Sequence, residues 1–256
     1  MTGSLQCRDV SVVFGGLAAL NGVSLNVGAG SFTGLIGPNG SGKTTLLNVV
    51  TGVQRPTHAE IELDHRRIDH LTLHERARAG IARTFQTLRL FDTLDVIDNV
   101  TLGAHRLCER SAFESVFHTS AARRELRRQR EVAEELLAVF GERLLPRLDQ
   151  QIVTLSYANR RRVEIARALM MRPAILLLDE PAAGMNPAET EELAEQLRML
   201  TAMVGCSVLL VEHKMDFIAA LCSEVYVLDH GACLAHGPPS SVQQDPMVAE
   251  AFFGIE

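Results

Sequence analysis

The sequence predicts an α/β fold, in which a small antiparallel sheet precedes a mainly parallel sheet and a helical insertion interrupts the latter. Apolar runs of strand length alternate with helical segments between residues 175 and 228, as in βαβ units. Short apolar segments separated by glycine-rich turns fill residues 4–36, which favours antiparallel strands. Between residues 93 and 155 helical periodicity replaces the strand pattern.

The first part of the chain is expected to form strands joined by two short helices. Thr72 and Glu75 have the types and spacing of a capping box, which predicts a helix over residues 72–79 with Gly80 as its C-terminal cap. Another helix is expected over residues 45–50, directly after a glycine-rich loop. Short apolar runs predict strands over residues 31–36, 59–63 and 81–85.

The helical insertion is expected to have one apolar and one basic face. The apolar residues with helical spacing are Leu126, Ala133, Leu137 and Phe140. The basic residues of the other face are Arg123, Arg124, Arg127 and Arg128. Such a face could meet lipid headgroups or acidic partner surfaces, although a solvated helix face is the interpretation we favour.

The last part of the chain is expected to form buried strands and long helices. The continuous apolar run Ile175 to Leu178 predicts a strand buried on both faces of a parallel sheet. Asn186, Pro187 and Glu189 supply the N-cap, N1 and N3 positions of a helix that ends before Gly205. Strands are expected over residues 206–211 and 225–228, with a helix over 214–222.

Composition indicates a globular protein rather than one that spans a membrane or binds nucleic acid over a large surface. The chain has 256 residues, 46% of them hydrophobic, and a formal net charge of −6, which disfavours extensive nucleic-acid binding. No apolar run approaches the roughly 20 residues of a membrane span. The first five residues lack the features of a signal peptide, so we expect a cytoplasmic protein.

The five cysteines lack the CxxC spacing of zinc sites, and their odd number argues against a disulfide framework. We expect reduced, buried thiols at Cys7, Cys108, Cys206, Cys222 and Cys233.

The most informative motif is a glycine-rich loop between an expected strand and an expected helix. It consists of a glycine, four residues and then Gly-Lys-Thr, the pattern of a phosphate-binding loop. Its backbone amides and the following helix N-terminus favour anions, Lys43 adds charge at the β- and γ-phosphates, and the Thr44 hydroxyl suits Mg²⁺. The residues expected to bind a nucleoside triphosphate here are Gly37, Pro38, Asn39, Gly40, Ser41, Gly42, Lys43, Thr44 and Thr45.

Two adjacent acids, Asp179 and Glu180, follow the buried strand at its carboxyl end, where α/β sheets bind ligands. Asp179 is predicted to hold Mg²⁺ or its water. Glu180 is predicted to orient the attacking water and accept its proton.

Three further motifs reveal a family resemblance. Leu155-Ser156 opens a helix about twenty residues before the acids, Gln86 follows the strand over 81–85, and His213 follows the strand over 206–211. With the phosphate loop and the acids, this order resembles the ATP-binding cassette (ABC) ATPases over essentially the whole chain. The resemblance implies a RecA-like P-loop core with an antiparallel β subdomain. It also implies one cassette domain, with residues 1–86 and 160–256 as the core and 87–159 as a helical subdomain.

The resemblance also implies roles for individual residues. Phe14 would stack on adenine, although core packing is an alternative for this residue. Gln86 would contact Mg²⁺ or the water, and His213 the γ-phosphate, although His213 could also be an ordinary surface histidine. Ser156 and Ala158 would complete the ATP site of a second cassette, so that two cassettes enclose two ATP molecules.

Within the family, the chain is similar to the ATPases of branched-chain amino-acid importers. The similar segments are residues 14–17, 82–86, 88–91 and 181–187, together with the arginine-rich insertion. This implies ATP-driven dimer closure on the cytoplasmic face of the inner membrane, with permease subunits and, indirectly, an extracytoplasmic solute-binding protein as partners. The alternatives are a urea or short-amide importer, a lipopolysaccharide-export ATPase, a non-transport cassette, or a weakly hydrolytic regulatory cassette.

The chain departs from the family after Leu155-Ser156, where Ala158 and Asn159 replace the usual glycine and glutamine. A β-carbon at position 158 costs little if φ is helical and strains the backbone if φ is positive. We expect a working signature with a weaker γ-phosphate contact.

Overall fold

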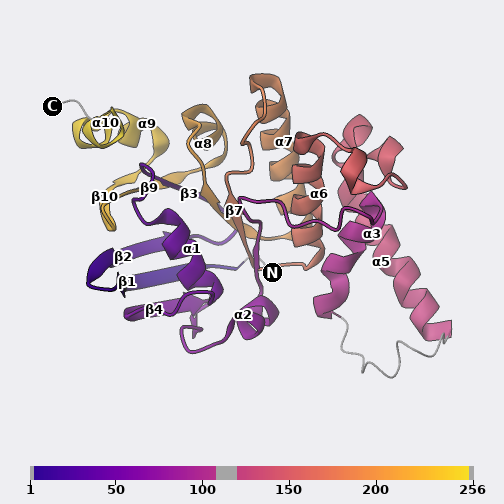
Figure 1. Ribbon diagram of the computed structural model, residues 1–256, viewed down its shortest axis with the longest axis horizontal. Coiled ribbons are helices and arrows are strands. Elements are labelled where there is room, and N and C mark those ends of the chain that lie inside the picture. The colour runs from indigo at the N-terminus through magenta and orange to yellow at the C-terminus, as the bar shows by residue number, and fades with distance from the viewer. Residues whose placement is uncertain (1–2, 108–119, 254–256) are drawn as a thin grey trace.

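The computed structural model describes residues 3–107 and 120–253, and Figure 1 shows two sheets flanked by helices. Their strand orders are β2-β1-β4-β5 and β10-β9-β3-β8-β7-β6. The first sheet is antiparallel, with β1 (Leu5–Phe14), β2 (Leu17–Val27), β4 (His58–Leu63) and β5 (Arg66–Arg67). The second comprises β3 (Phe32–Ile36), β6 (Ile81–Arg83), β7 (Ile175–Asp179), β8 (Ser207–Val211), β9 (Glu224–Asp229) and β10 (Ala232–Gly237).

The predicted α/β class is therefore confirmed, with one correction to the antiparallel part. Only β1 and β2 of residues 4–36 join the antiparallel sheet, whereas β3 pairs parallel with β8 and β9 in the second sheet. The apolar sequence of β3 allows this because its residues are covered on both faces. In the second sheet only β10 pairs antiparallel, with β9.

The helices follow the predicted start and stop signals. The predicted capping box forms at Thr72 with Glu75. The predicted N-cap Asn186 forms a second capping box with Glu189, and Gly205 ends that helix at a positive φ of 73°. The α-helices are α1 (Lys43–Thr51), α2 (Leu73–Ala79), α3 (Val96–Thr101), α5 (Ser120–Ala138), α6 (Tyr157–Met170), α7 (Pro187–Val204), α8 (Met215–Leu221), α9 (Pro239–Gln243) and α10 (Pro246–Phe253). The short 3₁₀ segments are η1 (Leu102–Leu107), η2 (Gly141–Arg143), η3 (Leu145–Arg147) and η4 (Ile152–Thr154).

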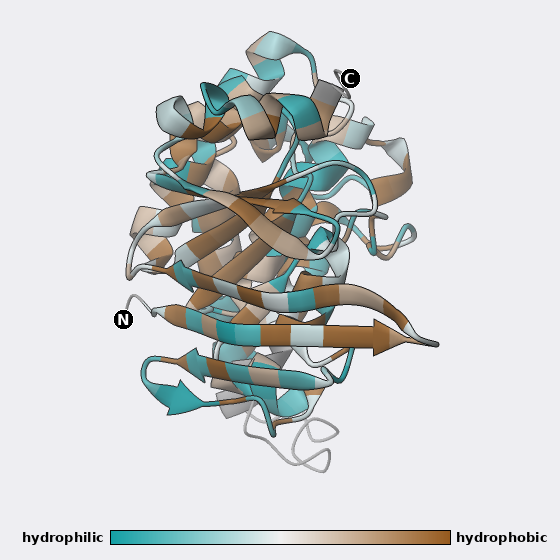
Figure 2. Ribbon diagram, turned by 90° about the vertical axis from the view of Figure 1, so that its left-hand side faces the viewer, coloured by the Kyte–Doolittle hydropathy of each residue, from teal (hydrophilic) through white to brown (hydrophobic). Residues whose placement is uncertain are grey.

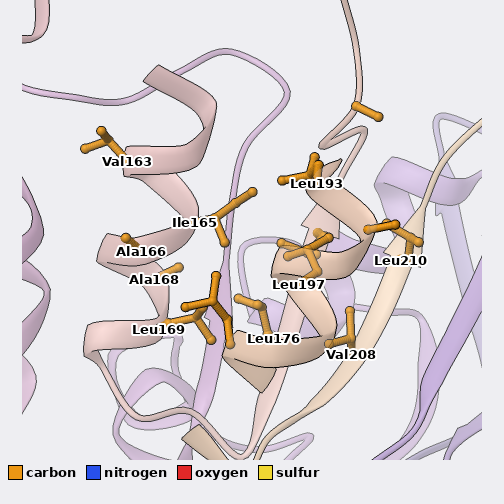
Figure 3. Close-up of a cluster of buried hydrophobic side chains, with 14 of the residues drawn as sticks. Val163, Ile165, Ala166, Ala168, Leu169, Leu176, Leu193, Leu197, Val208 and Leu210 are labelled. Carbon is orange, nitrogen blue, oxygen red and sulfur yellow. The ribbon is translucent and has the colours of Figure 1, made fainter. Parts of the chain in front are cut away.

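Alternate residues of the central strands pack into two different cores. Leu176 and Leu178 face α6 and α7, whereas Ile175 and Leu177 face α1 and the antiparallel sheet. Figure 3 shows the first core, in which side chains of α6 and α7 meet Leu176. In Figure 2 the strands in the interior of the molecule are coloured mainly brown, which marks hydrophobic residues. Because side chains alternate between the faces of a strand, burial on both faces requires the continuous apolar run of the sequence.

The helical region has its expected character, with one residue misplaced. Ala133, Leu137 and Phe140 are buried, but Leu126 is 64% exposed. Figure 1 shows the N-terminal end of α5 pointing away from the sheets, so within the described residues this end has little to pack against. No helix in the described part of the chain is long and apolar enough to cross a membrane.

The cysteine prediction is confirmed for three residues and wrong for a fourth. Cys7, Cys206 and Cys222 are buried free thiols, and burial raises the pKa of each to about 12, which keeps them unreactive. Cys233 is exposed because it lies on β10, the edge strand of its sheet. Cys108 lies outside the described residues.

Candidate nucleotide site

The glycine-rich loop joins β3 to α1, as predicted. Gly37 has φ 148°, and a β-carbon there would lie 2.1 Å from the Leu228 carbonyl oxygen. Gly42 has φ 107°, and its β-carbon would lie 2.8 Å from the Ala19 carbonyl oxygen. Glycine is therefore required at both positions by close backbone approach as well as by φ.

The interior of the loop is polar. The Lys43 side chain turns back on the loop, where Nζ donates to the carbonyl oxygens of Gly37 at 2.7 Å and Pro38 at 2.8 Å. Burial lowers the pKa of Lys43, and the carboxylates of Glu180 and Asp179 oppose that shift. The buried Ser41 hydroxyl has no hydrogen-bond partner among the described residues. A buried orphan hydroxyl beside a cation and the N-terminus of α1 suits an anionic ligand.

Two predicted residues from two other segments of the chain meet at Glu180. The Nε2 atom of His213 lies 3.1 Å from Glu180 Oε1, and the Gln86 amide nitrogen lies 3.5 Å from Oε2. Glu180 itself has a positive φ of 49°, which costs a non-glycine residue on the order of 1 kcal/mol or more. Strain of this kind persists where the surroundings fix the backbone, and here the Glu180 amide donates to the Val211 carbonyl at 2.9 Å.

A cavity of about 200 Å³ joins the loop to Gln86 and Glu180. A larger groove of about 710 Å³ between α7 and α8 contains none of the predicted site residues. We therefore place the candidate site at the smaller cavity, on chemistry rather than size. It is lined by Ala19, Asn39, Gly40, Gly42, Lys43, Thr44, Thr45, Gln86, Glu180 and Val211.

Asp179 ends β7 beside this cavity and is held by a residue to which the sequence analysis gave no role. The Arg83 guanidinium donates from Nη2 to Asp179 Oδ2 at 2.9 Å, and both side chains are only 5% exposed. Arg83 lies in the segment that carried the family resemblance. Arg83 lies beside Asp179 because β6 pairs parallel with β7. That pairing depends on the order of strands in the sheet, which the sequence does not reveal.

The Gln86 backbone is held by a buried ion pair on α6, which the sequence analysis also missed. Arg161 Nη1 donates to the Phe85 carbonyl at 2.6 Å and to Glu164 Oε2 at 2.7 Å, and its Nη2 donates to the Gln86 carbonyl at 3.1 Å. Glu164 Oε1 in turn accepts from the Phe85 amide at 3.4 Å. The only sequence signal was an Arg and a Glu three residues apart on a helix.

The Leu155-Ser156 motif lies at the N-terminus of α6, outside the cavity. The exposed Ser156 caps the helix by accepting from the Asn159 amide at 3.3 Å. Ala158 is helical, so its β-carbon imposes no positive-φ strain. The side-chain oxygen Oδ1 of Asn159 accepts from Arg162 Nη1 at 3.4 Å. In a single chain, Ser156 and Ala158 are thus separate from the phosphate loop.

Phe14 lies at the turn between β1 and β2 and is 47% exposed. The alternative that Phe14 is a core residue is therefore wrong. Its ring is available to stack on a planar ligand, and that role stays a prediction.

The donor set suits a magnesium ion that is bound together with a phosphate. Thr44, Gln86 and Asp179 offer oxygen ligands, the type that Mg²⁺ prefers. No cluster of three or more His, Cys, Asp or Glu side chains among the described residues could hold a metal by itself. Mg²⁺ in nucleotide sites is usually held by one or two protein oxygens plus phosphates and water, so an all-protein cage is not required.

Comparisons with known proteins identify the family of the chain. The family model for ABC transporters matches residues 20–183. The high-affinity branched-chain amino acid transport ATP-binding protein BraF of Pseudomonas aeruginosa is 39% identical over 98% of this chain and 97% of its own length. LivG of Escherichia coli, which has the same description, is 38% identical with the same coverage.

Solved structures show the same fold. A nucleotide-free ATP-binding cassette from an ABC transporter superposes with a TM-score of 0.84 at 31% identity, covering 99% of this chain and 100% of the other. A dimeric cassette bound to ADP and phosphate superposes with a TM-score of 0.74 at 25% identity, covering 92% and 98%. With a family match over more than half of its length and relatives above 30% identity over nearly all of it, the chain belongs to the ABC transporter family as an ATP-binding cassette.

Proposed function

We propose that this cassette hydrolyses ATP to power an importer of branched-chain or other hydrophobic amino acids. The observation that carries the catalytic part is the convergence of Gln86 and His213 on Glu180 at the mouth of the phosphate loop. The solute is supported by the relatives, since BraF and LivG are described as ATP-binding proteins of branched-chain amino-acid transport.

Glu180 is the general base in this proposal. Its carboxylate accepts the proton of the attacking water, and His213 and Gln86 orient that carboxylate and the water. Lys43 leaves its loop carbonyls to contact the phosphates, while the loop amides hold them. Mg²⁺, held by Thr44, Asp179 and Gln86, supplies charge neutralisation at the phosphates when bound.

The second half of each site comes from another cassette, either a copy of this chain or a related one. The exposed Ser156 and the first amides of α6 form a helix N-terminus that suits an anion. The cassette structure described as dimeric and bound to ADP and phosphate supports this arrangement. Closure of two such chains adds hydrogen-bond donors to the γ-phosphate and excludes water.

The remaining partners follow from the same proposal. Permease subunits attach the cassette to the cytoplasmic face of the cell membrane, and an extracytoplasmic solute-binding protein delivers the amino acid to them. A urea or short-amide importer is the second candidate, favoured by the segment Arg83 to Gln86 that both types share.

The test substitutes Glu180→Gln, which keeps size and hydrogen bonding but removes the base. ATP turnover should fall at least 100-fold, while ATP binding persists and an ATP-bound dimer accumulates on size-exclusion chromatography. Turnover close to that of the native chain would contradict the role of Glu180. Absence of turnover in the native chain itself, assembled with its permease, would favour a regulatory cassette.

The same variant tests the solute. In cells that carry it in place of the native chain, uptake of radiolabelled leucine should be lost. Uptake of labelled urea should be unaffected. The opposite pattern would favour the urea importer.

A further inference from the structure

Arg83 lies between α1, the helix that follows the phosphate loop, and Asp179, the predicted magnesium ligand. It is the last residue of β6, which pairs parallel with β7 through Arg83 and Leu177. Asp179 lies two residues after Leu177 at the end of β7. The pairing thus brings the Arg83 side chain beside the carboxylate, at 2.9 Å from Nη2 to Oδ2.

The guanidinium is anchored on its other side. Its Nη1 atom donates to Asn48 Oδ1 at 2.6 Å, and Asn48 belongs to α1, the helix that begins at Lys43. Arg83 Cζ also lies over the Phe85 ring, 5.1 Å from the ring centroid. Two hydrogen bonds and this ring contact therefore hold the guanidinium beside Asp179, although its buried Nε has no hydrogen-bond partner among the described residues.

The geometry leaves one carboxylate oxygen for another ligand. Oδ2 of Asp179 accepts from Arg83, while Oδ1 takes part in no hydrogen bond with any residue that the structure describes. A carboxylate that is 5% exposed needs a fixed cationic or hydrogen-bonding partner to remain in place. Arg83 provides that partner and fixes the side-chain torsion of Asp179.

We propose that Arg83 is a positioning residue for the divalent cation of the ATP site, because it holds one oxygen of Asp179 and presents the other. The inference rests on the proposed function, since it takes Asp179 as the ligand of Mg²⁺ or its water. Arg83 does not touch the nucleotide in this proposal. It acts through Asp179, and its hydrogen bond to Asn48 fixes the position of that acid relative to α1.

Electrostatics alone would predict the opposite role for Arg83. A guanidinium paired with the acid repels a divalent cation, which by itself weakens metal binding. The anchoring by Asn48 favours positioning, because a purely competing arginine would have to be released when the metal binds.

The test measures how strongly Mg²⁺ increases nucleotide affinity. The chain has no tryptophan whose fluorescence could report binding, so binding is followed by the change in fluorescence of N-methylanthraniloyl ADP, and ADP avoids turnover. Affinity is measured with and without Mg²⁺ for the native chain and for Arg83→Met. Loss of a residue that orients a metal ligand without touching the metal typically lowers metal affinity about 10- to 100-fold. We expect affinity without Mg²⁺ to change less than about twofold and the increase due to Mg²⁺ to fall about tenfold or more.

Three further variants sharpen the result. Arg83→Lys keeps a cation beside Asp179 but cannot bridge to Asn48 with a planar fork, so it should recover only part of the Mg²⁺ effect. Asn48→Ala should reduce the effect in the same direction and by less. The matched control is Arg89→Met, because the exposed Arg89 also covers the Phe85 ring, at 4.3 Å, but makes no contact with Asp179. This control should behave as the native chain.

The outcomes separate the inference from the proposed function. If the native chain binds the nucleotide without any Mg²⁺ effect, the proposed site itself fails. If the native chain shows the effect and Arg83→Met shows it equally, positioning by Arg83 is wrong. A stronger Mg²⁺ effect in Arg83→Met would overturn positioning and indicate competition. If Arg83→Met does not fold, Asn48→Ala and Arg83→Lys decide in the same way.

Discussion

Helices α5 and α6 are both rich in arginine, but they differ in how far their arginine side chains are exposed to solvent. On α5, Arg123, Arg124, Arg127 and Arg128 are exposed, and so is Arg130. On α6, Arg161 and Arg162 are completely buried. The difference lies in what surrounds each helix. α6 contacts α3, α5, α7 and β6, whereas the N-terminal end of α5 points away from the sheets (Figure 1).

The comparison shows how burial converts a solubilising residue into a structural one. The exposed arginines of α5 keep their charges in water, which supports the solvated-face interpretation. The buried arginines of α6 must find partners for their donors inside the protein. Their terminal nitrogens donate to the Gln86 backbone and to α7, while the buried Nε of Arg161 has no hydrogen-bond partner among the described residues. Helix α6, which Ser156 caps, is thereby tied to the loop that carries Gln86.

The largest effect is expected for Arg161→Leu. This change leaves the Glu164 carboxylate, 2% exposed, without its partner and removes donors from the carbonyls of Phe85 and Gln86. Breaking a buried pair on one side typically costs about 3–5 kcal/mol. We expect a loss of that size in the free energy of unfolding, measured by urea denaturation.

A double variant separates stability from positioning. Arg161→Leu with Glu164→Leu removes both buried charges, so most of the lost stability should return. The Gln86 carbonyl still lacks the hydrogen bond from Arg161, so ATP turnover should stay low. Recovery of turnover together with stability would contradict the positioning of Gln86 by this pair.

A smaller effect is expected for Arg162→Met. Arg162 donates to Gln196 and Glu192 at 3.2 and 3.3 Å, but Glu192 is 33% exposed and keeps Arg143 at 2.9 Å. No charge is stranded in the interior, so we expect a loss of about 1–3 kcal/mol in the free energy of unfolding. A loss equal to that of Arg161→Leu would show that burial alone, and not the stranded partner, sets the cost.

The smallest effect is expected on α5, for Arg130→Gln. Arg130 pairs with Glu134 at 3.0 Å, one helical turn away, but both side chains are more than 40% exposed. Such pairs contribute about 0.3–0.5 kcal/mol, and salt screens them. We expect a change below about 0.5 kcal/mol in the same urea denaturation experiment, with unchanged ATP turnover. A loss above about 1 kcal/mol would mean that α5 is not a solvated face.

The candidate site was predictable where residue type and chain position alone define the chemistry. Gly37 and Gly42 form the expected loop, and Glu180 meets Gln86 and His213 as the motif order implied. The roles of these residues, and those of Ser156 and Ala158 toward a second cassette, stay predictions. Arg83 and Arg161 were not assigned, because their contacts with Asp179 and Gln86 span about 75 to 96 positions along the chain.

The fold was predictable where local signals are strong and less so where packing decides. Capping boxes and the apolar run of β7 predicted their elements well, since both depend on neighbouring residues. The exposure of Leu126, by contrast, depends on how far α5 extends beyond its packing partners. The elements β10, α9 and α10 were not assigned, because short segments near the end of the chain are stabilised mainly by the sheet they join.

By itself, therefore, the sequence determined the class of fold, the phosphate loop and the identity of the acids at the end of β7, because these depend on local spacing and on side-chain alternation. Only the tertiary structure decided which sheet takes β3, which arginines are buried, and what holds Asp179 and Gln86 in place. Those features depend on strand order and on packing between distant segments, which no local pattern specifies.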